Sequence, residues 1–267
     1  MNSDSRVFER ASGATPLVVS FPHVGTEIPQ DIATALTEDG RRVADTDWHV
    51  HLLYSFVRAT GSAWLRARYS RYVIDLNRPP DDATLYPGQT TTGLCPDLTF
   101  DGRPIYDGEA PTGEAVARRR DQYWRPYHAA LAELIDAARA RHGYAVLLDA
   151  HSIRSVVPRL FAGRLPDVNV GTNDGKSCAS ALGASVMAVL AAQSTFSHVL
   201  NGRFKGGYIT RHYGDPSRRV HAIQLEIAQA AYMDESGFLY DANRTRPLQR
   251  VLQTVVDALL SFRPERA

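Results

Sequence analysis

The chain has 267 residues, 44% of them hydrophobic, which fits one large α/β domain with a substantial core better than two small domains. A formal net charge of +1 provides no field for nucleic acid or an anionic membrane surface. Cys95 and Cys178 lie far apart and outside any Cys-x-x-Cys spacing, which argues against a disulfide framework and a cysteine zinc site.

The N-terminal segment is polar. Its first 15 residues lack the apolar core of a signal peptide, and no apolar stretch of the chain approaches the roughly 18 residues of a membrane span. We therefore expect a cytoplasmic protein with no membrane or nucleic-acid partner. One domain should occupy residues 1–267, with residues 1–14 disordered or peripheral.

The first part of the chain alternates between strand-like and helix-like patterns. Residues 16–21 (PLVVSF) are a run of apolar and β-branched side chains, typical of a strand covered on both faces. Over residues 41–61 apolar side chains recur at helical spacing, and Gly61 follows as a stop. Residues 63–80 predict one or two strands that end at a Pro-Pro pair.

The alternation continues after a long loop. Residues 81–112 are rich in Gly, Pro, Thr and Asp, and a loop of this length in a compact domain is typical of a lid or binding loop over a site. A long helix is predicted over residues 113–143, broken at Pro126. The later predicted elements are a strand at 144–152, a helix at 176–193, a strand at 220–229 and a helix at 245–262. Strands separated by helices imply a single α/β domain with a mostly parallel central sheet and helices on both faces.

Polar side chains stand at the ends of these strands. His23 follows the first strand, Asn77 and Arg78 follow the second, His151 ends the third and Glu226 lies near the end of the last. The carboxyl ends of parallel strands meet at one edge of a sheet, and ligands bind outside that edge. We therefore expect a catalytic or metal site there.

The two histidines are candidate metal ligands. A catalytic zinc in a site without cysteine takes three imidazole or carboxylate ligands and keeps one position open for water. His23 and His151 supply two of them. Asp149, two residues before His151, is a candidate to hydrogen-bond a ligand imidazole. The residues alone leave the third ligand open among Asp45, Asp47, His49, His51 and Glu27.

Glu226 is the candidate general base. In residues 220–227 successive side chains face opposite sides of a strand, so Glu226 shares a small or polar face with Gln224. A carboxylate near a metal can take the proton of an attacking water and pass it to a leaving amine. His212 is a second candidate, either for stabilising a tetrahedral intermediate or as a packing residue.

Several longer motifs follow one another along the chain. They are SFPHVGTEIP, DTDWHVHLLY, RYVIDLNRPPDD, LYPGQTTTGLCP, LLDAHSIRS, LPDVNVGTNDGKSC, GGYITRHYGDP and HAIQLEIAQAAYMDE. Their order and spacing, from about residue 15 to 260, resemble the N-formylglutamate deformylases, amidohydrolases that end one branch of histidine degradation. That family is similar in architecture to zinc carboxypeptidases and aspartoacylases, which use one zinc, a late glutamate base and an Asn-Arg pair that holds a substrate carboxylate.

The resemblance implies hydrolysis of N-formyl-L-glutamate to L-glutamate and formate, with Zn²⁺ or another divalent metal as cofactor. It favours Asp47 as the third ligand and matches DLNR at 75–78 to the Asn-Arg pair. The His-x-x-Glu motif of the exopeptidases is absent, because Thr26 stands at the Glu position and Glu27 comes one residue late.

The implied substrate is a small dianion without a compensating cation, so its site needs several guanidinium groups that bind carboxylates through two hydrogen bonds. Arg71, Arg78 and Arg211 are the candidates, and Asn77 adds a neutral donor. Arg211 lies in the glycine-flanked stretch GGYITRHYG, whose backbone can approach a ligand closely.

Two alternatives remain open at this point. One is an aspartoacylase-like or carboxypeptidase-like zinc hydrolase of another N-acyl acidic amino acid. The other is a protein that binds a dicarboxylate without turnover. Glu226 discriminates against the second, because a binding protein has no need of a base beside a metal.

Overall fold

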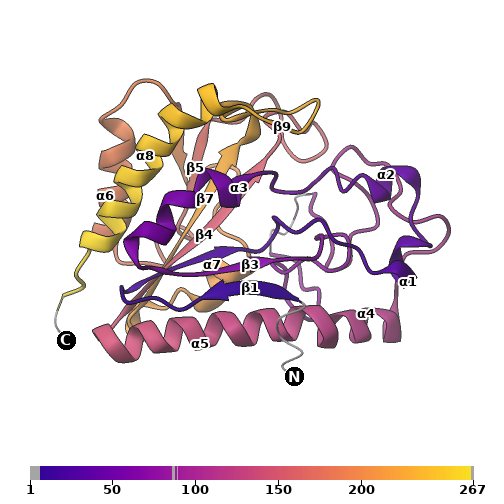
Figure 1. Cartoon of the computed structure of the whole chain (residues 1–267), viewed down its shortest axis with the longest axis horizontal. Coiled ribbons are helices and arrows are strands. Elements are labelled where there is room, and N and C mark those ends of the chain that lie inside the picture. The colour runs from indigo at the N-terminus through magenta and orange to yellow at the C-terminus, as the bar shows by residue number, and fades with distance from the viewer. Residues whose placement is uncertain (1–6, 86–87, 89, 266–267) are drawn as a thin grey trace.

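A seven-stranded sheet forms the centre of the computed structural model, which describes residues 7–85, 88 and 90–265 (Figure 1). Its strands are β1 (Phe8–Ala11), β2 (Leu17–Phe21), β3 (Ala63–Ala67), β4 (Ala145–Ile153), β5 (Val168–Gly171), β6 (His198–Leu200) and β7 (Val220–Ala228). They lie in the order β1-β3-β2-β4-β7-β5-β6. The run from β3 to β7 is parallel, as is the pair β5–β6, whereas β1 and β5 pair antiparallel with β3 and β7. The predicted single α/β fold with a mostly parallel sheet is confirmed.

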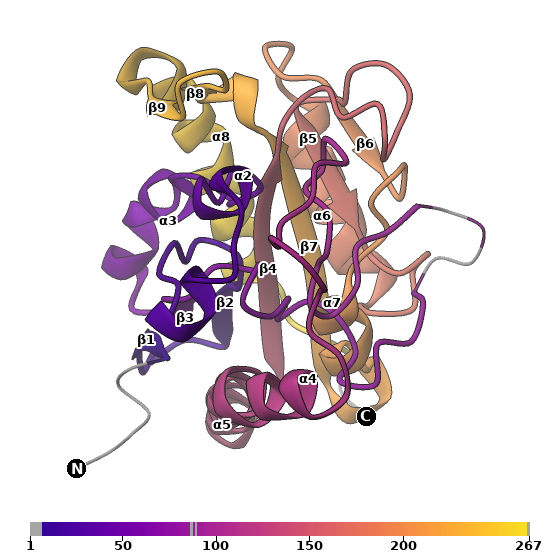
Figure 2. The ribbon, with the colours of Figure 1, turned by 90° about the vertical axis from the view of Figure 1, so that its right-hand side faces the viewer.

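Helices cover both faces of this sheet (Figures 1 and 2). One face packs against α5 (Arg125–His142) and α7 (Tyr208–Tyr213). The opposite face packs against α3 (Val50–Leu53), α6 (Ser180–Ala191) and α8 (Ala242–Ser261). Because successive side chains of a strand alternate between faces, the central strands contribute to both cores.

The central strand β4 shows how the fold places the site. Leu147 faces α5, whereas Val146 and Leu148 face the core on the other side. The next residues that alternate with Leu147 are Asp149 and His151, both buried. The apolar face of β4 therefore becomes polar near its carboxyl end, where Asp149 contacts the polar side chains of Asn77 and of Thr210 on α7.

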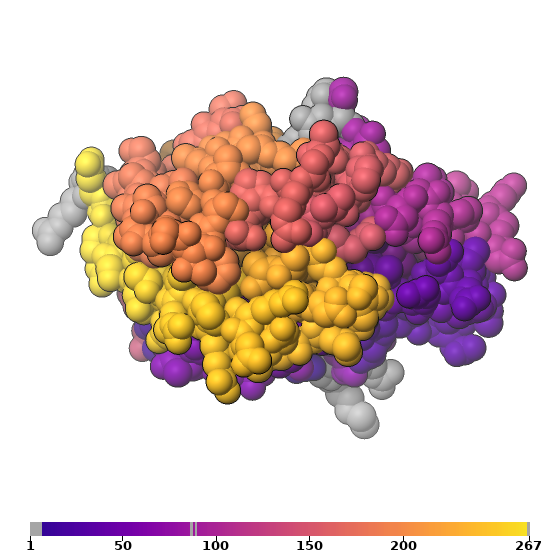
Figure 3. All heavy atoms as spheres, turned by 90° about the horizontal axis from the view of Figure 1, so that it is seen from above, coloured from indigo at the N-terminus to yellow at the C-terminus, as the bar shows by residue number. Residues whose placement is uncertain are grey.

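Shorter elements complete the fold. They are α1 (Gln30–Ala33), α2 (Glu38–Arg41), α4 (Gly113–Arg119), a π-helical turn at Arg120–Trp124, 3₁₀ turns at Ser55–Thr60, Pro216–Arg218 and Gln229–Ala231, and a hairpin of β8 (Met233–Asp234) and β9 (Leu239–Tyr240). On the face seen in Figure 3, the yellow C-terminal segment that includes α8 lies beside the segment around residue 200, which is orange. Among the described residues, no helix combines the length and apolar character needed to span a membrane.

The predicted helix over residues 41–61 is wrong in extent. After α2, the chain forms turns in which Val43 and His49 take left-handed backbone angles, with φ of 44° and 62°. Left-handed residues interrupt a right-handed helix, so regular helix resumes only at α3. The predicted stop at Gly61 is confirmed by its φ of 70°. Asp47 consequently lies in an irregular stretch between turns and not on a helix face.

Two further predicted elements differ from the structure. Residues 63–80 contain one strand, in agreement with the predicted one or two, but this strand, β3, ends at Ala67 and not at the Pro-Pro pair. The helix over residues 113–143 is not broken at Pro126, because this proline stands in the first turn of α5, directly after the π-helical turn. The helix ends at Gly143, as predicted.

The two segments predicted to be irregular have different outcomes. Residues 1–6 lie outside the described part of the chain, but Phe8–Ala11 form the edge strand β1, so this part of the predicted peripheral tail is ordered. The described residues of the 81–112 loop contain no helix and no strand beyond isolated bridges.

The central position of β4 can be tested through stability. Leu147 is fully buried, so Leu147→Ala should lower the free energy of unfolding by about 2–5 kcal/mol, through lost burial and the cavity left behind. Leu239→Ala is the matched control, since Leu239 is 63% exposed, and should change stability by less than about 0.5 kcal/mol. Urea unfolding of both variants measures the difference, and equal losses would contradict this assignment of the core.

Candidate active site

A cavity lies at the carboxyl ends of β2, β4 and β7. Its wall includes His23, which follows β2, His151 at the end of β4, and Gln224 and Glu226 on β7. The 81–112 loop contributes Leu85, Thr90, Thr91, Thr92 and Phe100. The loop predicted to lie over the site is therefore part of the wall of this cavity.

Strand register brings the polar ends together. In the β4–β7 pair, His151 stands directly opposite Glu226. In the β2–β4 pair, Ser20 stands opposite Asp149. His23 follows Ser20 by three residues and His151 follows Asp149 by two, so both histidines lie at the same edge of the sheet. The His23 and His151 rings lie 4.9 Å apart between centroids.

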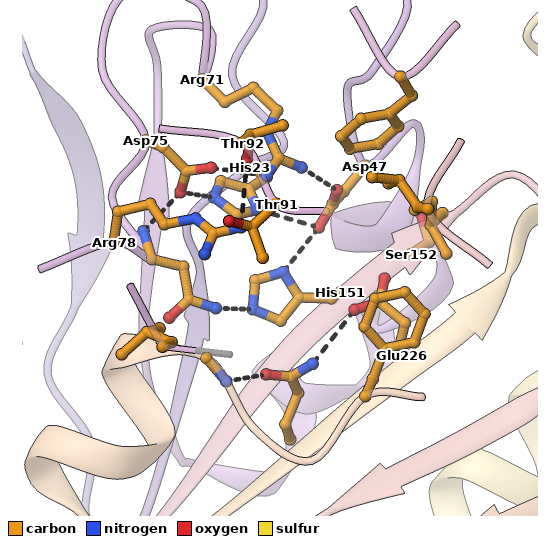
Figure 4. A pocket seen from close by; sticks show the side chains of 18 of the residues that line it. His23, Asp47, Arg71, Asp75, Arg78, Thr91, Thr92, His151, Ser152 and Glu226 are labelled. Carbon is orange, nitrogen blue, oxygen red and sulfur yellow. Dashed lines mark hydrogen bonds and ion pairs between the residues drawn. The ribbon is translucent and has the colours of Figure 1, made fainter. Parts of the chain in front are cut away.

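His23, Asp47 and His151 converge on one point (Figure 4). Each offers one potential ligand atom, and these atoms all lie within 4.8 Å of one another. Asp47 Oδ2 is 2.9 Å from His151 Nδ1 and 3.8 Å from His23 Nδ1. All three side chains are buried. Two imidazoles and one carboxylate are a donor set that suits a divalent metal such as zinc.

A second carboxylate holds the far nitrogen of each imidazole. His23 Nε2 lies 2.7 Å from Asp75 Oδ1, and His151 Nε2 lies 3.0 Å from Asp149 Oδ2. At His23 this arrangement places a proton on Nε2 and leaves Nδ1 to face the centre, a pattern common to metal-ligating histidines. His151 Nε2 also lies 2.9 Å from Asn77 Nδ2, and His151 Nδ1 faces Asp47 Oδ2. The predicted contact between Asp149 and His151 is present.

The two imidazoles differ in their preference for charge. Burial and the Arg71 guanidinium lower the pKa of His23, so this ring is neutral at pH 7. Burial also opposes a charge on His151, but the carboxylates of Asp149 and Asp47 outweigh it and raise the pKa of His151 well above its ordinary value. The centre therefore favours one positive charge between the rings, which either a proton or a metal ion can supply.

The structure places the other candidates for the third ligand elsewhere. Asp45 accepts hydrogen bonds from Tyr72 Oη and the Phe100 amide. Glu27 pairs with Arg68 at the surface. His49 hydrogen-bonds the Phe238 carbonyl, and His51 lines a separate small pocket together with Tyr54.

Glu226 lies where the strand pattern predicted it, on the same face of β7 as Gln224. It is buried beside His151, and this burial raises the pKa of its carboxyl to about 8. Gln224 Nε2 donates a hydrogen bond to Glu226 Oε2 at 3.2 Å. A carboxylate in this position can exchange a proton near neutral pH.

Arg71 is bound tightly within the protein. Its Nη2 donates to Asp75 Oδ2 at 2.6 Å, and its guanidinium lies over the Phe100 ring. Its Nη1 is 3.9 Å from Asp47 Oδ1. Asp75 therefore links Arg71 to His23, and Arg71 faces the cavity from a fixed position.

Asn77 and Arg78 also line the cavity. Asn77 Oδ1 accepts from the Ile209 amide at 2.7 Å, and its Nδ2 donates to Asp149 Oδ2 at 3.3 Å. Arg78 Nη2 donates to Thr92 Oγ1 at 3.2 Å. The Asn-Arg pair is thus tied to α7 on one side and to the 81–112 loop on the other.

The backbone of this segment is held by the long helix. Trp124 Nε1 donates to the Arg78 carbonyl at 3.0 Å, and His128 Nε2 lies 2.8 Å from the Leu76 carbonyl. The two rings stack with centroids 3.8 Å apart. Side chains of the helix therefore satisfy carbonyl groups that the turns after β3 leave unpaired.

Arg211 and His212 are not among the described residues that line the cavity. Arg211 Nε donates to the Gly206 carbonyl. His212 is exposed and stacks on Tyr208, with ring centroids 4.8 Å apart. Both stand on α7, and the sequence pattern of this short helix does not reveal which of its side chains face the sheet.

The cavity residues that were not predicted as site residues include Asp75, Gln224 and Arg203. Asp75 could have been found, because it precedes Asn77 by two residues and follows Arg71 by four. Gln224 shares the face of Glu226 and was noted only for that reason. Arg203 reaches the cavity from the segment after β6 and has no periodic signal.

The sequence is similar to those of known proteins over nearly its whole length. A sequence model of the N-formylglutamate amidohydrolase family matches residues 15–233. The N-formylglutamate deformylase of Pseudomonas aeruginosa is 52% identical over 256 residues, which cover 95% of this chain and 96% of that protein. The protein of the same name from Pseudomonas putida is 48% identical over 263 residues, covering 98% of each chain.

A solved structure of the same family has a similar fold. The N-formylglutamate amidohydrolase of Ralstonia eutropha JMP134 is 31% identical and superposes with a TM-score of 0.80. The match covers 94% of this chain and 97% of that chain. As its sequence motifs predicted, the chain belongs to the N-formylglutamate amidohydrolase family.

Proposed function

We propose that this protein hydrolyses N-formyl-L-glutamate to L-glutamate and formate with a Zn²⁺ ion held by His23, Asp47 and His151. The observation that carries the proposal is the convergence of these three side chains beside the buried carboxyl of Glu226. The names of the two Pseudomonas relatives support the substrate. The proposed places of the reaction, in histidine degradation and in the cytoplasm, stay predictions from the sequence.

The residues present fit a divalent cation. Both imidazoles turn Nδ1 towards Asp47, and their Nε2 atoms lie beside Asp75 and Asp149. The raised pKa of His151 reflects the same preference for positive charge at this point. A bound Zn²⁺ would polarise the formyl carbonyl and lower the pKa of a water molecule from about 16 to about 7.

Glu226 would carry the proton in the reaction. Its carboxylate accepts a proton from the attacking water and donates it to the leaving amine of glutamate. Burial raises its affinity for that proton, and the neighbouring His151 lowers it. A group balanced in this way near neutral pH suits both halves of the transfer.

Arginines in the wall would hold the two carboxylates of the substrate. Arg78 and Arg203 both line the cavity, and Arg203 is oriented by hydrogen bonds to the carbonyls of Leu160 and Thr90 at 2.9 and 3.2 Å. Carbonyl partners orient a guanidinium without removing its charge. Arg71, held by Asp75, would add a fixed positive charge close to the reacting carbonyl.

A panel of small substrates tests the proposal directly. N-formyl-L-glutamate should be hydrolysed with a higher kcat/KM than N-acetyl-L-glutamate, N-formyl-L-aspartate and N-formyl-L-norleucine. Release of formate and glutamate is measured with the zinc-loaded protein. Faster hydrolysis of the acetyl compound would favour an aspartoacylase-like enzyme, and binding without hydrolysis would contradict the proposal.

The metal assignment can be tested by elemental analysis. His23→Ala and His151→Ala each remove one of three ligands, so bound zinc should fall well below one ion per chain and turnover should be abolished. His212→Ala is the control, because His212 is exposed and should not alter the zinc content. Full zinc occupancy in both ligand variants would reject the assignment.

The role of Glu226 can be separated from metal binding. Glu226→Gln keeps the size of the side chain but cannot accept a proton, so kcat should fall by about 10²- to 10⁴-fold. Zinc content should be normal and KM within a few-fold of the parent. A variant with its zinc in place and a parent-like kcat would show that the base lies elsewhere.

Substrate recognition can be tested at Arg78. Arg78→Lys keeps the charge but loses the planar pair of donors, so kcat/KM for N-formyl-L-glutamate should fall by about 10- to 150-fold, the equivalent of roughly 1.5–3 kcal/mol. Most of the loss should appear in KM. Arg118→Lys is the control, because the Arg118 side chain on α4 is 70% exposed, and it should leave KM unchanged. Equal KM values for both variants and the parent would place Arg78 outside the substrate site.

A further inference from the structure

The side-chain amide of Gln224 has only one chemically allowed orientation. The Gly207 amide lies 2.7 Å from Gln224 Oε1. A backbone N–H can only donate, so the atom that it faces must be the oxygen. The NH₂ group of Gln224 must then face the other way, towards Glu226 Oε2 at 3.2 Å (Figure 4).

The same reasoning fixes the amide of Asn77. The Ile209 amide donates to Asn77 Oδ1 at 2.7 Å, and the Tyr208 amide donates to the Asn77 carbonyl at 3.2 Å. The NH₂ group of Asn77 therefore faces Asp149 and His151. Three successive backbone amides at the start of α7 thus donate to Gln224 and Asn77.

Gly207 permits this close approach. A Cβ atom at position 207 would lie 2.3 Å from Asn77 Nδ2, far inside van der Waals contact. A side chain there would force Asn77 or the start of α7 to move. The glycine therefore serves the packing of α7 against the site.

We propose that Gln224 is a positioning residue for Glu226, and that the Gly207–Ile209 amides join it to Asn77 in one hydrogen-bonded bridge. The proposal rests on the proposed function, because it takes Glu226 to be the general base. Glu226 can rotate about its last torsion, which has no sharp minimum of its own. The hydrogen bond from Gln224 holds one carboxylate oxygen and so sets the direction of the other.

The bridge has a structural consequence for the reaction. It connects the residue that moves the proton to the Asn-Arg pair that faces the substrate. The connection uses short local segments and no flexible side chain apart from the two amides. Small displacements of α7 would therefore misplace Glu226 and Asn77 together.

Gln224→Met tests the positioning role in the zinc-loaded enzyme. Methionine fills a similar volume without a donor or an acceptor, so kcat should fall by about 10- to 100-fold, as for partners that orient catalytic groups. KM and zinc content should stay close to the parent. Gln224→Glu keeps the acceptor for the Gly207 amide but replaces the donor, and it should lower kcat similarly even if the methionine variant folds poorly.

A double-mutant cycle separates positioning from general damage. If Gln224 acts through Glu226, then adding Gln224→Met to Glu226→Gln should lower the residual kcat by less than about three-fold. Equal losses in both backgrounds would overturn the proposal while leaving Glu226 as the base. A parent-like kcat for Glu226→Gln would overturn both the base assignment and the positioning role.

Asn169→Leu is the matched control. Asn169 stands opposite Glu226 on β5 and is fully buried, but its Nδ2 donates to the backbone carbonyl of Glu226 at 3.1 Å and not to the carboxylate. This variant should lose stability and keep kcat within a few-fold of the parent. A loss of kcat equal to that of Gln224→Met would mean that loosening of β7 explains both, and the positioning role would be rejected.

Discussion

The register of β4 against β7 is the constraint on which the site depends. It puts His151 opposite Glu226, and with them Asp149 opposite Gln224. All four side chains are buried on the face that packs against α5 and α7. A slip of one residue would turn His151 to the opposite face, because side chains alternate along a strand. The apolar residues before them, which pack into two separate cores, fix this register without contributing to the chemistry.

Burial of several carboxylates around two imidazoles is the second constraint. A buried charge is costly unless it is paired and hydrogen-bonded. Asp75 meets this condition through Arg71 and His23, which hold its pKa well below the usual range even though burial alone would raise it. Within the described part of the chain, the Glu226 carboxylate accepts a hydrogen bond from the Gln224 amide and none from an arginine, and burial raises the pKa of this carboxyl. Within the same buried site, Asp75 is thus stabilised as a carboxylate, whereas Glu226 can exchange its proton.

Features carried by a single strand could be predicted from the sequence. The buried runs that end in His23 and His151, and the alternation that puts Glu226 beside Gln224, follow from local pattern alone. The position of Asp47 could not, because it depends on left-handed turns at Val43 and His49 where apolar spacing predicts a helix. Arg211 and His212 were expected at the site from their motif, and neither is among the described residues that line the cavity. Contacts between distant segments, such as Asp75 with His23, have no local signal.

The π-helical turn between α4 and α5 sets the position of the helix side chains that hold the backbone of Asn77 and Arg78. Trp124 closes that turn and His128 follows one helical turn later, and both hydrogen-bond the backbone that carries Asn77 and Arg78. Loss of one residue from the turn would rotate the preceding α4 by about 100° relative to α5, because each residue of an α-helix advances by that angle. Arg119, at the end of α4, would then lose the Val73 carbonyl that it now contacts. The helical segment from α4 to α5 therefore determines the backbone conformation of residues 76–78. An insertion or deletion in this segment would displace the residues that carry Asn77 and Arg78.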